Sequence, residues 1–465
     1  MLKKRKIYFR ADAGPEIGYG HYIRSLALAD MLKRDFDCTM FTQSPTNYQL
    51  REAEEVCPVV ALPADNTKFD KFIDYLSGDE IVVLDNYFFT TDYQGQIKAK
   101  GCKLVCIDDM HDKHYVADVV INHGVDDAGL FDVESYTRLC LGYPYALLRK
   151  PFLDTQVTSI HNEGVYVVCF GGSDPYNLTK KYIDLLINSQ LPKRIYAVVG
   201  DGYQYLETLK KYSTVEVLSN LTATQMADLF RSAEAVVCSA STTAFEALAC
   251  GCKVYAGWYV DNQVGFYNQL CDYNAIVPLA GLLDNHLLIE KSYETDKISF
   301  TASGHNLRNV FWRFVLREVN YQSLTEDESR QVWQTRNLPQ IRKWMLNPEP
   351  FSREEHLEFV AGLKQREDKL YIAFFDRGQL VASYDLVDIH DGSAVCGLFL
   401  HPDYEGLGIA SLVEDIMEEK ARKKAINQFV SQVMNSNVAS LAFFTRNKFR
   451  QTAKDAQFTY FIKQI

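Results

Sequence analysis

The sequence has no excess of basic residues, because 60 Asp and Glu outnumber 49 Lys and Arg and give a formal net charge of -11. A protein whose main task is to grip nucleic-acid phosphates needs a concentrated surplus of Lys and Arg, so we expect no nucleic-acid partner. No apolar run follows the basic start MLKKRKIYFR, as a secretory signal or a membrane anchor would require. We therefore expect a cytoplasmic protein with no membrane partner.

The cysteines also lack the arrangement of a disulfide framework or a zinc site. Their number, 11, is odd, and several lie in apolar runs where a free thiol packs as a small hydrophobe. Cys102 and Cys106, and likewise Cys250 and Cys252, have no second pair at zinc-finger spacing. The loop DDMHDKH (108–114) has ligands for a divalent ion, but a solvated loop or polar cleft wall is favoured. We expect no metal.

The length of 465 residues exceeds what one hydrophobic core supports, so we expect several domains. Short β-rich runs alternate with helical stretches from residue 1 to 150, and the same rhythm restarts at VYVVCFGG (165–172). Such alternation predicts βαβ units and parallel sheets. We predict two Rossmann-like domains, over residues 1–150 and 151–319.

The order of elements changes after a helical pattern at residues 300–319. Helix-rich stretches come first, followed by two antiparallel strands joined at Asp376 to Gly378 and by a third strand. A glycine-bearing turn and a long helix follow. No Pro/Gly/Ser-rich linker and no internal repeat marks the change. We predict a third domain, of α+β type, over residues 320–465.

A glycine-bearing loop follows the first predicted strand, residues 7–10. It contains Gly18 and Gly20 and leads into a helix whose first turn carries His21. Glycines permit positive φ and close approach of the backbone, and a helix N-terminus offers free N–H groups to an anion. A neutral imidazole there can serve as a general base. The alternative is a structural histidine beside plain loop glycines, and the spacing alone leaves both open.

Two further turns follow predicted strands in the second domain. Gly171, Gly172 and Ser173 come directly after an apolar strand, where backbone amides can meet a phosphate. Small residues at Ser239 to Thr243 precede a helix that carries Glu246, and a carboxylate there can accept both hydroxyls of a ribose. Taken alone, each signal is weak: small residues at such a turn usually serve close packing, and a Glu in the first turns of a helix is usually a partner for the helix dipole.

Taken together, these segments resemble a known enzyme family. RADAG, GYGHYIRSLALA, LDNY (84–87), CIDD (106–109), LGYPYALLR (141–149), FGGSDP (170–175), STTAFEALACG and DNQ (261–263) follow one another as in the hydrolase that removes UDP from UDP-2,4-diacetamido-2,4,6-trideoxy-β-L-altropyranose, an intermediate of pseudaminic acid synthesis. The likeness covers residues 5–319. It implies a GT-B fold, related to the MurG-type glycosyltransferases, with substrate held between two Rossmann-like domains.

The resemblance also implies roles for individual residues. His21 would deprotonate the water that attacks the anomeric carbon and expels UDP. Tyr87 and Asn262 match positions in the sugar pocket, and Glu246 matches the ribose-binding position. Ser239 to Thr243 stand where the family often has adjacent glycines. The other residues expected around the substrate are Gly18, Gly20, Arg10, Asp12, Asp85, Gly171, Gly172, Ser173, Ser241, Thr242, Thr243 and Gln263.

A second glycine turn lies in GLFLHPDYEGLGIASLVEDIM, between a strand and a helix. Consecutive N–H groups from 405 to 410 can hold a pyrophosphate, although such a turn often only connects two elements. With NVASLAFFTRNKF (437–449), it resembles the GNAT superfamily of acetyl-CoA-dependent N-acetyltransferases, so acetyl-CoA is the expected co-substrate. The expected coenzyme contacts are Leu398, Leu400, Gly406, Leu407, Gly408, Ile409, Ala410 and Asn437.

Two upstream segments, TRNLPQIRKWM (335–345) and EEHLEFV (354–360), narrow the resemblance to the acetyltransferase of the same pathway. That enzyme acetylates the 4-amino group of UDP-4-amino-4,6-dideoxy-N-acetyl-β-L-altrosamine. Helix packing is the alternative for Trp344 and His356. The residues expected on the sugar-nucleotide side are Arg336, Asn337, Trp344 and His356.

Two positions depart from the GNAT pattern. Glu405 stands where Gln or Arg usually heads the coenzyme turn, and its charge disfavours a pyrophosphate. Phe444 stands where a Tyr usually protonates the leaving thiolate, and Phe has no proton to donate. Another group or water must then act as the acid, or the domain is slow or inactive.

The sequence thus predicts a protein of the α/β class, with a GT-B-like pair of Rossmann-like domains followed by a GNAT α+β domain. The expected function is bifunctional: acetylation of a 4-amino UDP-sugar, and inverting hydrolysis of the diacetamido UDP-sugar. The alternative is a GT-B glycosyltransferase with a non-catalytic or sensor GNAT domain. UDP-sugar and acetyl-CoA are the expected small-molecule partners, and the oligomeric state stays open.

Overall fold

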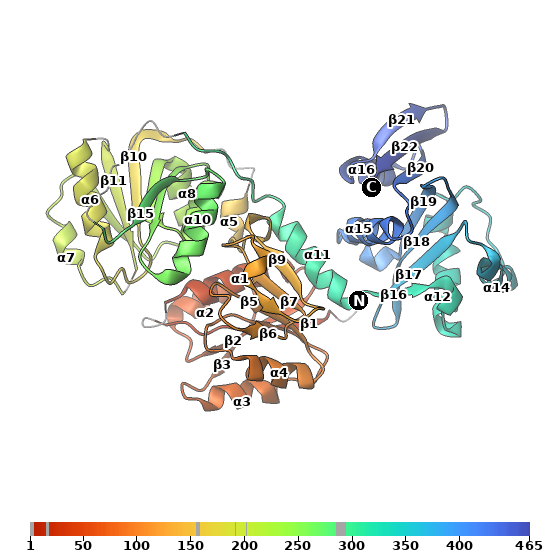
Figure 1. The fold of residues 1–465 in the computed structure, drawn as a ribbon, viewed down its shortest axis with the longest axis horizontal. Helices are drawn as coiled ribbons and strands as arrows, with labels where there is room; N and C mark the ends of the chain where they lie inside the picture. The colour runs from red at the N-terminus through yellow and green to blue at the C-terminus, as the bar shows by residue number, and fades with distance from the viewer. Residues whose placement is uncertain (1–3, 15–17, 155–158, 191, 201, 285–293) are drawn as a thin grey trace. The chain divides into compact units, whose positions relative to one another are not determined.

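The computed structural model describes residues 4–465 except 15–17, 155–158, 191, 201 and 285–293. The chain divides into two compact units between Arg308 and Asn309 (Figure 1). In the described part of the chain, no helix is both long and apolar enough to cross a membrane.

The first sheet is parallel, and its strand order is β3-β2-β1-β4-β5-β7-β9, drawn in red and orange in Figure 1. The strand IVVL of β4 is buried on both faces, as expected where helices cover a parallel sheet. The order reverses between β1 and β4, where loops at the carboxyl ends of strands form a ligand crevice. The elements are β1 Lys6–Arg10, α1 Gly20–Leu32, β2 Asp37–Gln43, α2 Asn47–Ala53, β3 Val59–Leu62, α3 Thr67–Asp74, β4 Ile81–Leu84, α4 Thr91–Ala99, β5 Lys103–Ile107, β6 His114–Tyr115, β7 Val119–Asn122, η1 Ala128–Leu130, β8 Asp132–Val133, β9 Arg138–Leu141 and η2 Tyr143–Tyr145.

The second sheet is also parallel, with the order β12-β11-β10-β13-β14-β15. Alternate residues of β10 enter different cores, since Val167 packs with Phe230 and Phe245 on one face while Val168 packs with Tyr182 on the other. The order reverses between β10 and β13. The elements are α5 Lys150–Leu153, β10 Asn162–Cys169, α6 Leu178–Ser189, β11 Arg194–Val199, α7 Leu206–Leu209, β12 Val215–Ser219, α8 Ala223–Ser232, β13 Ala233–Ser239, α9 Thr242–Ala249, β14 Lys253–Trp258, η3 Asp261–Gln263, α10 Val264–Asp272 and β15 Val277–Gly281.

The third sheet, with the order β16-β17-β18-β19-β20-β22-β21, is mostly antiparallel. The predicted hairpin is confirmed: Arg377 and Gly378 both have positive φ, as a two-residue turn of type I′ requires. The elements are α11 Ser303–Val315, β16 Arg317–Asn320, η4 Tyr321–Ser323, α12 Glu326–Arg336, α13 Pro339–Arg342, α14 Arg353–Gly362, η5 Leu363–Gln365, β17 Leu370–Asp376, β18 Gln379–His390, β19 Ser393–Leu400, η6 Pro402–Tyr404, α15 Ile409–Arg422, β20 Gln428–Met434, α16 Val438–Arg446, β21 Arg450–Lys454 and β22 Phe458–Gln464.

The helix predicted over residues 300–319 is too long at its C-terminal end. Helix α11 ends at Val315, and the next residues form β16, which pairs antiparallel with β17. The backbone of residues 317–320 is therefore used by a sheet partner more than 50 residues away, which helical periodicity cannot reveal. The predicted boundary at 319/320 falls inside this strand.

Strands β19 and β20 separate after a short parallel pairing. Ser393, Ala394 and Val395 are in register with residues 428–430, and the pairing ends there although β19 continues to Leu400. The stretch Cys396 to Leu400 pairs with β18 on its other side. Among the described residues, the edge of Cys396 to Leu400 that faces β20 has no paired strand, so another extended chain can pair with it.

Candidate functional site

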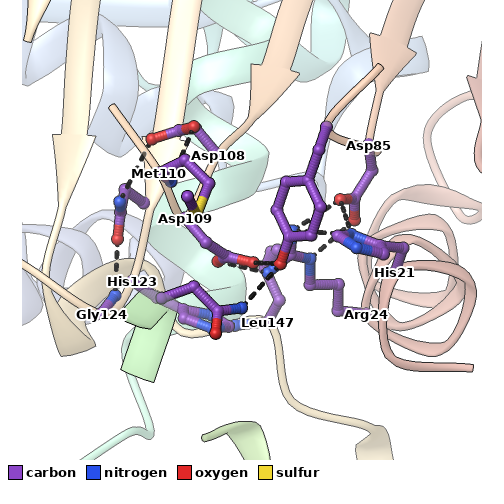
Figure 2. A network of polar contacts seen from close by, with 12 residues as sticks. His21, Arg24, Asp85, Asp108, Asp109, Met110, His123, Gly124 and Leu147 are labelled. Carbon is purple, nitrogen blue, oxygen red and sulfur yellow. Dashed lines mark hydrogen bonds and ion pairs between the residues drawn. The ribbon is translucent and has the colours of Figure 1, made fainter. Parts of the chain in front are cut away.

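A buried carboxylate directly after β4 organises the first site (Figure 2). Asp85 is completely buried, and its Oδ1 lies 2.7 Å from Nδ1 of His21 and 2.6 Å from Nη2 of Arg24. Its Oδ2 accepts from Nε of Arg24 at 2.7 Å and from Oγ of Ser25 at 3.0 Å. The three donors come from α1, which follows β1. Because β1 and β4 are neighbours, the sheet brings these groups together.

The charge of Asp85 fixes the tautomer of His21. Burial raises the pKa of the carboxyl group, but the charge of Arg24, the contact with His21 and the hydrogen bonds from both side chains together outweigh it and lower the pKa to about 2. An ionised carboxylate only accepts hydrogen bonds, so the proton between the two side chains belongs to Nδ1 of His21. Nε2 therefore keeps its lone pair, as a general base requires.

A chain of polar contacts extends from Arg24 to the second sheet (Figure 2). Nη1 of Arg24 lies 2.5 Å from Oδ1 of Asp109, and the Tyr87 hydroxyl donates to Oδ2 of Asp109 at 3.1 Å. Nδ2 of Asn262 donates to the Tyr87 hydroxyl at 2.8 Å. The ring of Tyr87 meets the His21 imidazole edge to face, with centroids 4.6 Å apart. The structure thus gathers His21, Tyr87 and Asn262, as the resemblance implies.

In the acidic loop at residues 108–114, the carboxylates of Asp108 and Asp109 accept hydrogen bonds from other groups of the protein. The Asp108 carboxylate accepts from N–H of Met110 and His111 at 3.0 and 2.8 Å, and from the Tyr115 hydroxyl at 2.5 Å. Asp109 is held by Arg24. Among the described residues, no group of three or more His, Cys, Asp or Glu side chains is arranged for a metal ion.

Three acidic or basic residues expected to touch substrate are completely buried: Arg10, Asp12 and Asp85. Arg10 pairs with Asp12, which also accepts from Nζ of Lys68 and the N–H of Gln43, both at 2.8 Å. Because these side chains have no exposed surface, they act through their protein partners: Arg10 and Asp12 support the loops, and Asp85 positions His21 and Arg24.

The first glycine loop is built for close backbone approach. Gly18 has a φ of +85°, and its N–H donates to the Gly14 carbonyl at 2.8 Å. A Cβ at Gly18 or Gly20 would meet no atom within 4 Å, so these positions face open space. The φ of Gly18 requires glycine, whereas Gly20 begins α1 next to His21. The intervening Pro15 to Ile17 lie outside the described residues.

The corresponding turn of the second sheet is exposed. Gly171 has a φ of +88°, and Gly171, Gly172 and Ser173 leave their backbone open to solvent. Gly200, which follows β11, packs on this turn, because a Cβ there would lie 2.6 Å from the backbone of Gly172. Gly200 is not among the predicted site residues, although a glycine directly after a neighbouring parallel strand is a signal that the sequence contains.

The turn after β13 places small residues at the start of α9. Ser241 is the N-cap, and Thr242 and Thr243 form the first turn. Glu246 is buried one turn later, and its Oε1 accepts from Nη2 and Nε of Arg149 at 2.8 and 2.9 Å. Burial raises the pKa of Glu246 against the opposing charge of Arg149. Arg149 is 97 positions away, so no sequence pattern could pair the two.

Gln263 and Asn337 hold loops in place. Oε1 of Gln263 accepts from the N–H of Tyr259 at 3.1 Å, which fixes the segment that carries Asn262. Asn337 bonds both the carbonyl and the N–H of Phe351, at 2.9 and 3.1 Å. Both side chains thus support loops, and their expected contacts with a ligand stay predictions.

The third sheet carries a cavity of about 1270 Å³ beside the separated strands β19 and β20. Most residues expected on either side of the acetyl transfer line it, and Trp344 at its wall is 36% exposed. His356 is buried, where its Nε2 contacts Oγ of Ser329 at 3.0 Å and burial lowers its pKa. The expected residues that line the cavity are Arg336, Trp344, His356, Leu398, Leu400, Gly406, Ala410 and Asn437.

The turn before α15 has the geometry of an anion site. Gly406 and Gly408 have φ values of +73° and +81°, and Gly408 is the N-cap of α15. A helix that begins after such a turn has free N–H groups in its first turn, and these can donate to an anion. Leu407 belongs to this turn, whereas Ile409 is buried below it.

Phe444 of α16 lies at the cavity wall and packs into the core. Its ring stacks on Phe461 with centroids 5.4 Å apart and meets Phe449 edge to face. The position is thus an apolar anchor of the helix, with no proton to give.

Comparison with known proteins finds relatives of both parts of the chain. Residues 338–449 match the model of the acetyltransferase (GNAT) family. The chain is 27% identical over 275 residues to the UDP-2,4-diacetamido-2,4,6-trideoxy-beta-L-altropyranose hydrolase of Campylobacter jejuni, covering 56% of this chain and 93% of the relative. It is 28% identical over 146 residues to acetyltransferase PseH of the same organism, covering 31% of this chain and 92% of the relative.

An uncharacterized protein of Methanocaldococcus jannaschii is 24% identical over 97% of both chains. The crystal structure of Campylobacter jejuni PseH in complex with acetyl coenzyme A matches 32% of this chain and 98% of its own length, at 23% identity and a TM-score of 0.27.

The protein is a two-part enzyme: a hydrolase-type unit of two Rossmann-like sheets is followed by a GNAT N-acetyltransferase domain. Its first part is a relative of the Campylobacter hydrolase, and its last part is a relative of PseH. One chain therefore joins counterparts of two separate proteins.

Replacement of Asp85 by Asn should destabilise the unit that contains His21 by roughly 3 kcal/mol, because buried Arg24 loses a charged partner. The folded-state pKa of about 2 lies below the ordinary 3.8, so this stabilisation is present above pH 3.8 and disappears as the pH falls through 2. Urea unfolding at neutral and acid pH measures both effects.

Asp30→Asn on the same helix is the matched control, since its pair with Lys33 is partly exposed and should contribute less. Equal losses in the two variants at neutral pH would contradict the central place of Asp85.

Proposed function

We propose that the chain catalyses two consecutive steps of pseudaminic acid synthesis in the cytoplasm. The C-terminal domain would acetylate the 4-amino group of UDP-4-amino-4,6-dideoxy-N-acetyl-β-L-altrosamine with acetyl-CoA. The first unit would then hydrolyse UDP-2,4-diacetamido-2,4,6-trideoxy-β-L-altropyranose to UDP and free sugar, with inversion. The observation that carries the proposal is the His21–Asp85 pair beside Tyr87 and Asn262, in a relative of that hydrolase.

In the hydrolytic step, Nε2 of His21 takes a proton from water while the water oxygen attacks the anomeric carbon. The bond from this carbon to the UDP oxygen breaks, and UDP keeps the electron pair. Asp85 then stabilises the imidazolium across the 2.7 Å contact, as the acid of a catalytic triad does. The Tyr87 ring against His21 holds the imidazole in place.

The second sheet would hold UDP. Backbone N–H groups at Gly171 to Ser173 and at the start of α9 suit the diphosphate, because they neutralise developing charge without a metal ion. Glu246 would accept the ribose hydroxyls, and Arg149 keeps its carboxylate in position. Asn262 would exchange its bond with Tyr87 for a bond to the sugar.

In the acetyltransferase domain, the turn at residues 405–410 would hold the pyrophosphate of acetyl-CoA. The free edge of β19, including Leu398 and Leu400, would pair with the pantetheine arm. Arg336 and Trp344, across the cavity, would face the nucleotide sugar. The product of this domain is then the substrate of the first unit, which accounts for their union in one chain.

The decisive experiment incubates the full chain with the 4-amino UDP-sugar and resolves the products by mass. With acetyl-CoA present, the free diacetamido sugar and UDP should both accumulate. If UDP appears only when a sugar or lipid acceptor is added, the first unit is a glycosyltransferase. If acetyl-CoA binds but no acetyl group moves, the GNAT domain is a sensor.

His21→Ala should cut hydrolysis by about two to four orders of magnitude while leaving the affinity for UDP almost unchanged, because only the general base is lost. UDP release from the diacetamido UDP-sugar gives the rate, and calorimetry with UDP gives the affinity. His390→Ala, at an exposed position of the other unit, is the control. Near-normal turnover in His21→Ala would refute the assignment of the base.

Glu405→Gln should tighten acetyl-CoA binding by up to about fivefold at low salt, because a negative charge beside the pyrophosphate turn is removed. The gain should shrink as salt is added. Calorimetry with acetyl-CoA measures it, and Glu358→Gln on the exposed face of α14 provides a charge-matched control. Unchanged affinity at every salt concentration would show that the pyrophosphate lies elsewhere.

A further inference from the structure

The carboxylate of Asp385, in the acetyltransferase cavity, differs from the other buried carboxylates in its lack of a structural partner among the described residues. Asp385 lies on β18, between Tyr371 of β17 and Gly397 of β19, and it lines the cavity. Among the described residues, no hydrogen bond or ion pair holds its carboxylate. A carboxylate on the wall of a substrate cavity, free of structural bonds, is available to a ligand.

Gly397 makes the space for this carboxylate. Directly opposite residues of neighbouring strands point their side chains to the same face. A Cβ at Gly397 would lie 2.9 Å from both oxygens of Asp385, so any other residue would displace them. Gly397 also belongs to the stretch of β19 that has left β20. If acetyl-CoA pairs with this edge, as proposed above, its thioester lies beside Asp385.

Three other side chains of the cavity wall could in principle accept a proton, but each has a different structural position. Glu355 accepts from the N–H of Ser352 at 2.6 Å and caps α14. His356 is buried against Ser329. Glu405 stands in the pyrophosphate turn. Of the carboxylates that line the cavity in the described part of the chain, Asp385 alone is placed beside the separated strands.

The surroundings of Asp385 suit proton transfer near neutral pH. Burial raises its pKa to about 6, although the positive charges of Arg336 and Lys369 oppose the rise. The carboxyl group is then mostly ionised at pH 7, yet basic enough to accept a proton from an ammonium group. The titratable groups that interact with its charge are Arg336 from α12, Lys369 beside β17, Tyr371 on β17, Tyr321 of η4 and, on the other face of the sheet, Cys396 of β19.

We propose that Asp385 is the general base of acetyl transfer in this domain, an assignment that rests on the acetyltransferase function proposed above. Its carboxylate takes one proton from the substrate ammonium and frees the nitrogen lone pair. The nitrogen then attacks the carbonyl carbon of the acetyl thioester, and the C–N bond forms. The tetrahedral intermediate collapses with rupture of the C–S bond, and the sulfur leaves with the electron pair.

The proton balance explains how the domain works with Phe444. The ammonium nitrogen begins with three protons and ends with one in the amide. Asp385 receives the first and returns it to solvent. The second leaves the nitrogen as the intermediate collapses and reaches the CoA thiolate through water, so no tyrosine hydroxyl is required.

The test compares the full chain with Asp385→Asn and Asp388→Asn, using the 4-amino UDP-sugar and acetyl-CoA and following thiol release from about pH 5 to 9. Asp388 is exposed near the end of the same strand and serves as the matched control. Asp385→Asn should lower kcat/KM by about two to three orders of magnitude at pH 7. Its affinity for acetyl-CoA, measured by calorimetry, should stay within about twofold of the parent.

The pH profile separates a base from a structural residue. The parent and Asp388→Asn should both lose activity below about pH 6, where Asp385 becomes protonated. In Asp385→Asn this limb should vanish, and its rate should approach the parent at high pH, where the amine is already neutral. A parent profile without the limb, or a variant that keeps both rate and limb, overturns the assignment of Asp385. An unaltered chain that binds acetyl-CoA but transfers no acetyl group overturns the proposed function itself.

Discussion

The ionised carboxylate of Asp85 is the interaction on which the first site depends. It is completely buried, and burial alone would favour its protonated form. Arg24 supplies the compensating charge through two contacts, and Ser25 adds a third donor. Only with this compensation does the carboxylate accept the Nδ1 proton of His21. The free lone pair of His21 Nε2 therefore depends on the ion pair between Asp85 and Arg24.

Parallel topology explains why these groups meet. His21 follows β1 and Asp85 follows β4, and the strand order of the first sheet reverses between these two strands. The second sheet repeats the arrangement, with Gly171 after β10 and Ser241 after β13. Loops at such a reversal diverge and leave a crevice. The hydrogen bond between Asn262 and Tyr87 joins loops of the two sheets, and the Tyr87 ring contacts His21.

Much of this fold follows from local sequence signals. Apolar runs such as IVVL predict buried strands, and the glycines before His21 predict the turn into α1, because each signal acts within a few residues. Local signals do not predict features that depend on a distant part of the chain. Residues 317–320 form a strand because they pair with β17, and buried Asp12 forms an ion pair with Lys68, 56 positions away. Arg24 could have been predicted as a site residue, because it lies one helical turn from His21 on the same face of α1.

Both active sites would have to bind an anionic diphosphate in a chain that is itself acidic. Each would bind a diphosphate although the protein carries a net charge of -11. A surface excess of Lys and Arg is not needed, since N–H groups at the starts of α9 and α15 are fixed donors that carry partial positive charge. The charged side chains that remain near the sites are then free for proton chemistry. Asp85 holds its proton acceptor His21 from a fully buried position, whereas Asp385 faces a cavity and can itself take a proton. Asp85 is fully buried and paired, so it supports the base His21. Asp385 faces the cavity and lacks such pairing among the described residues, so it can itself act as a base.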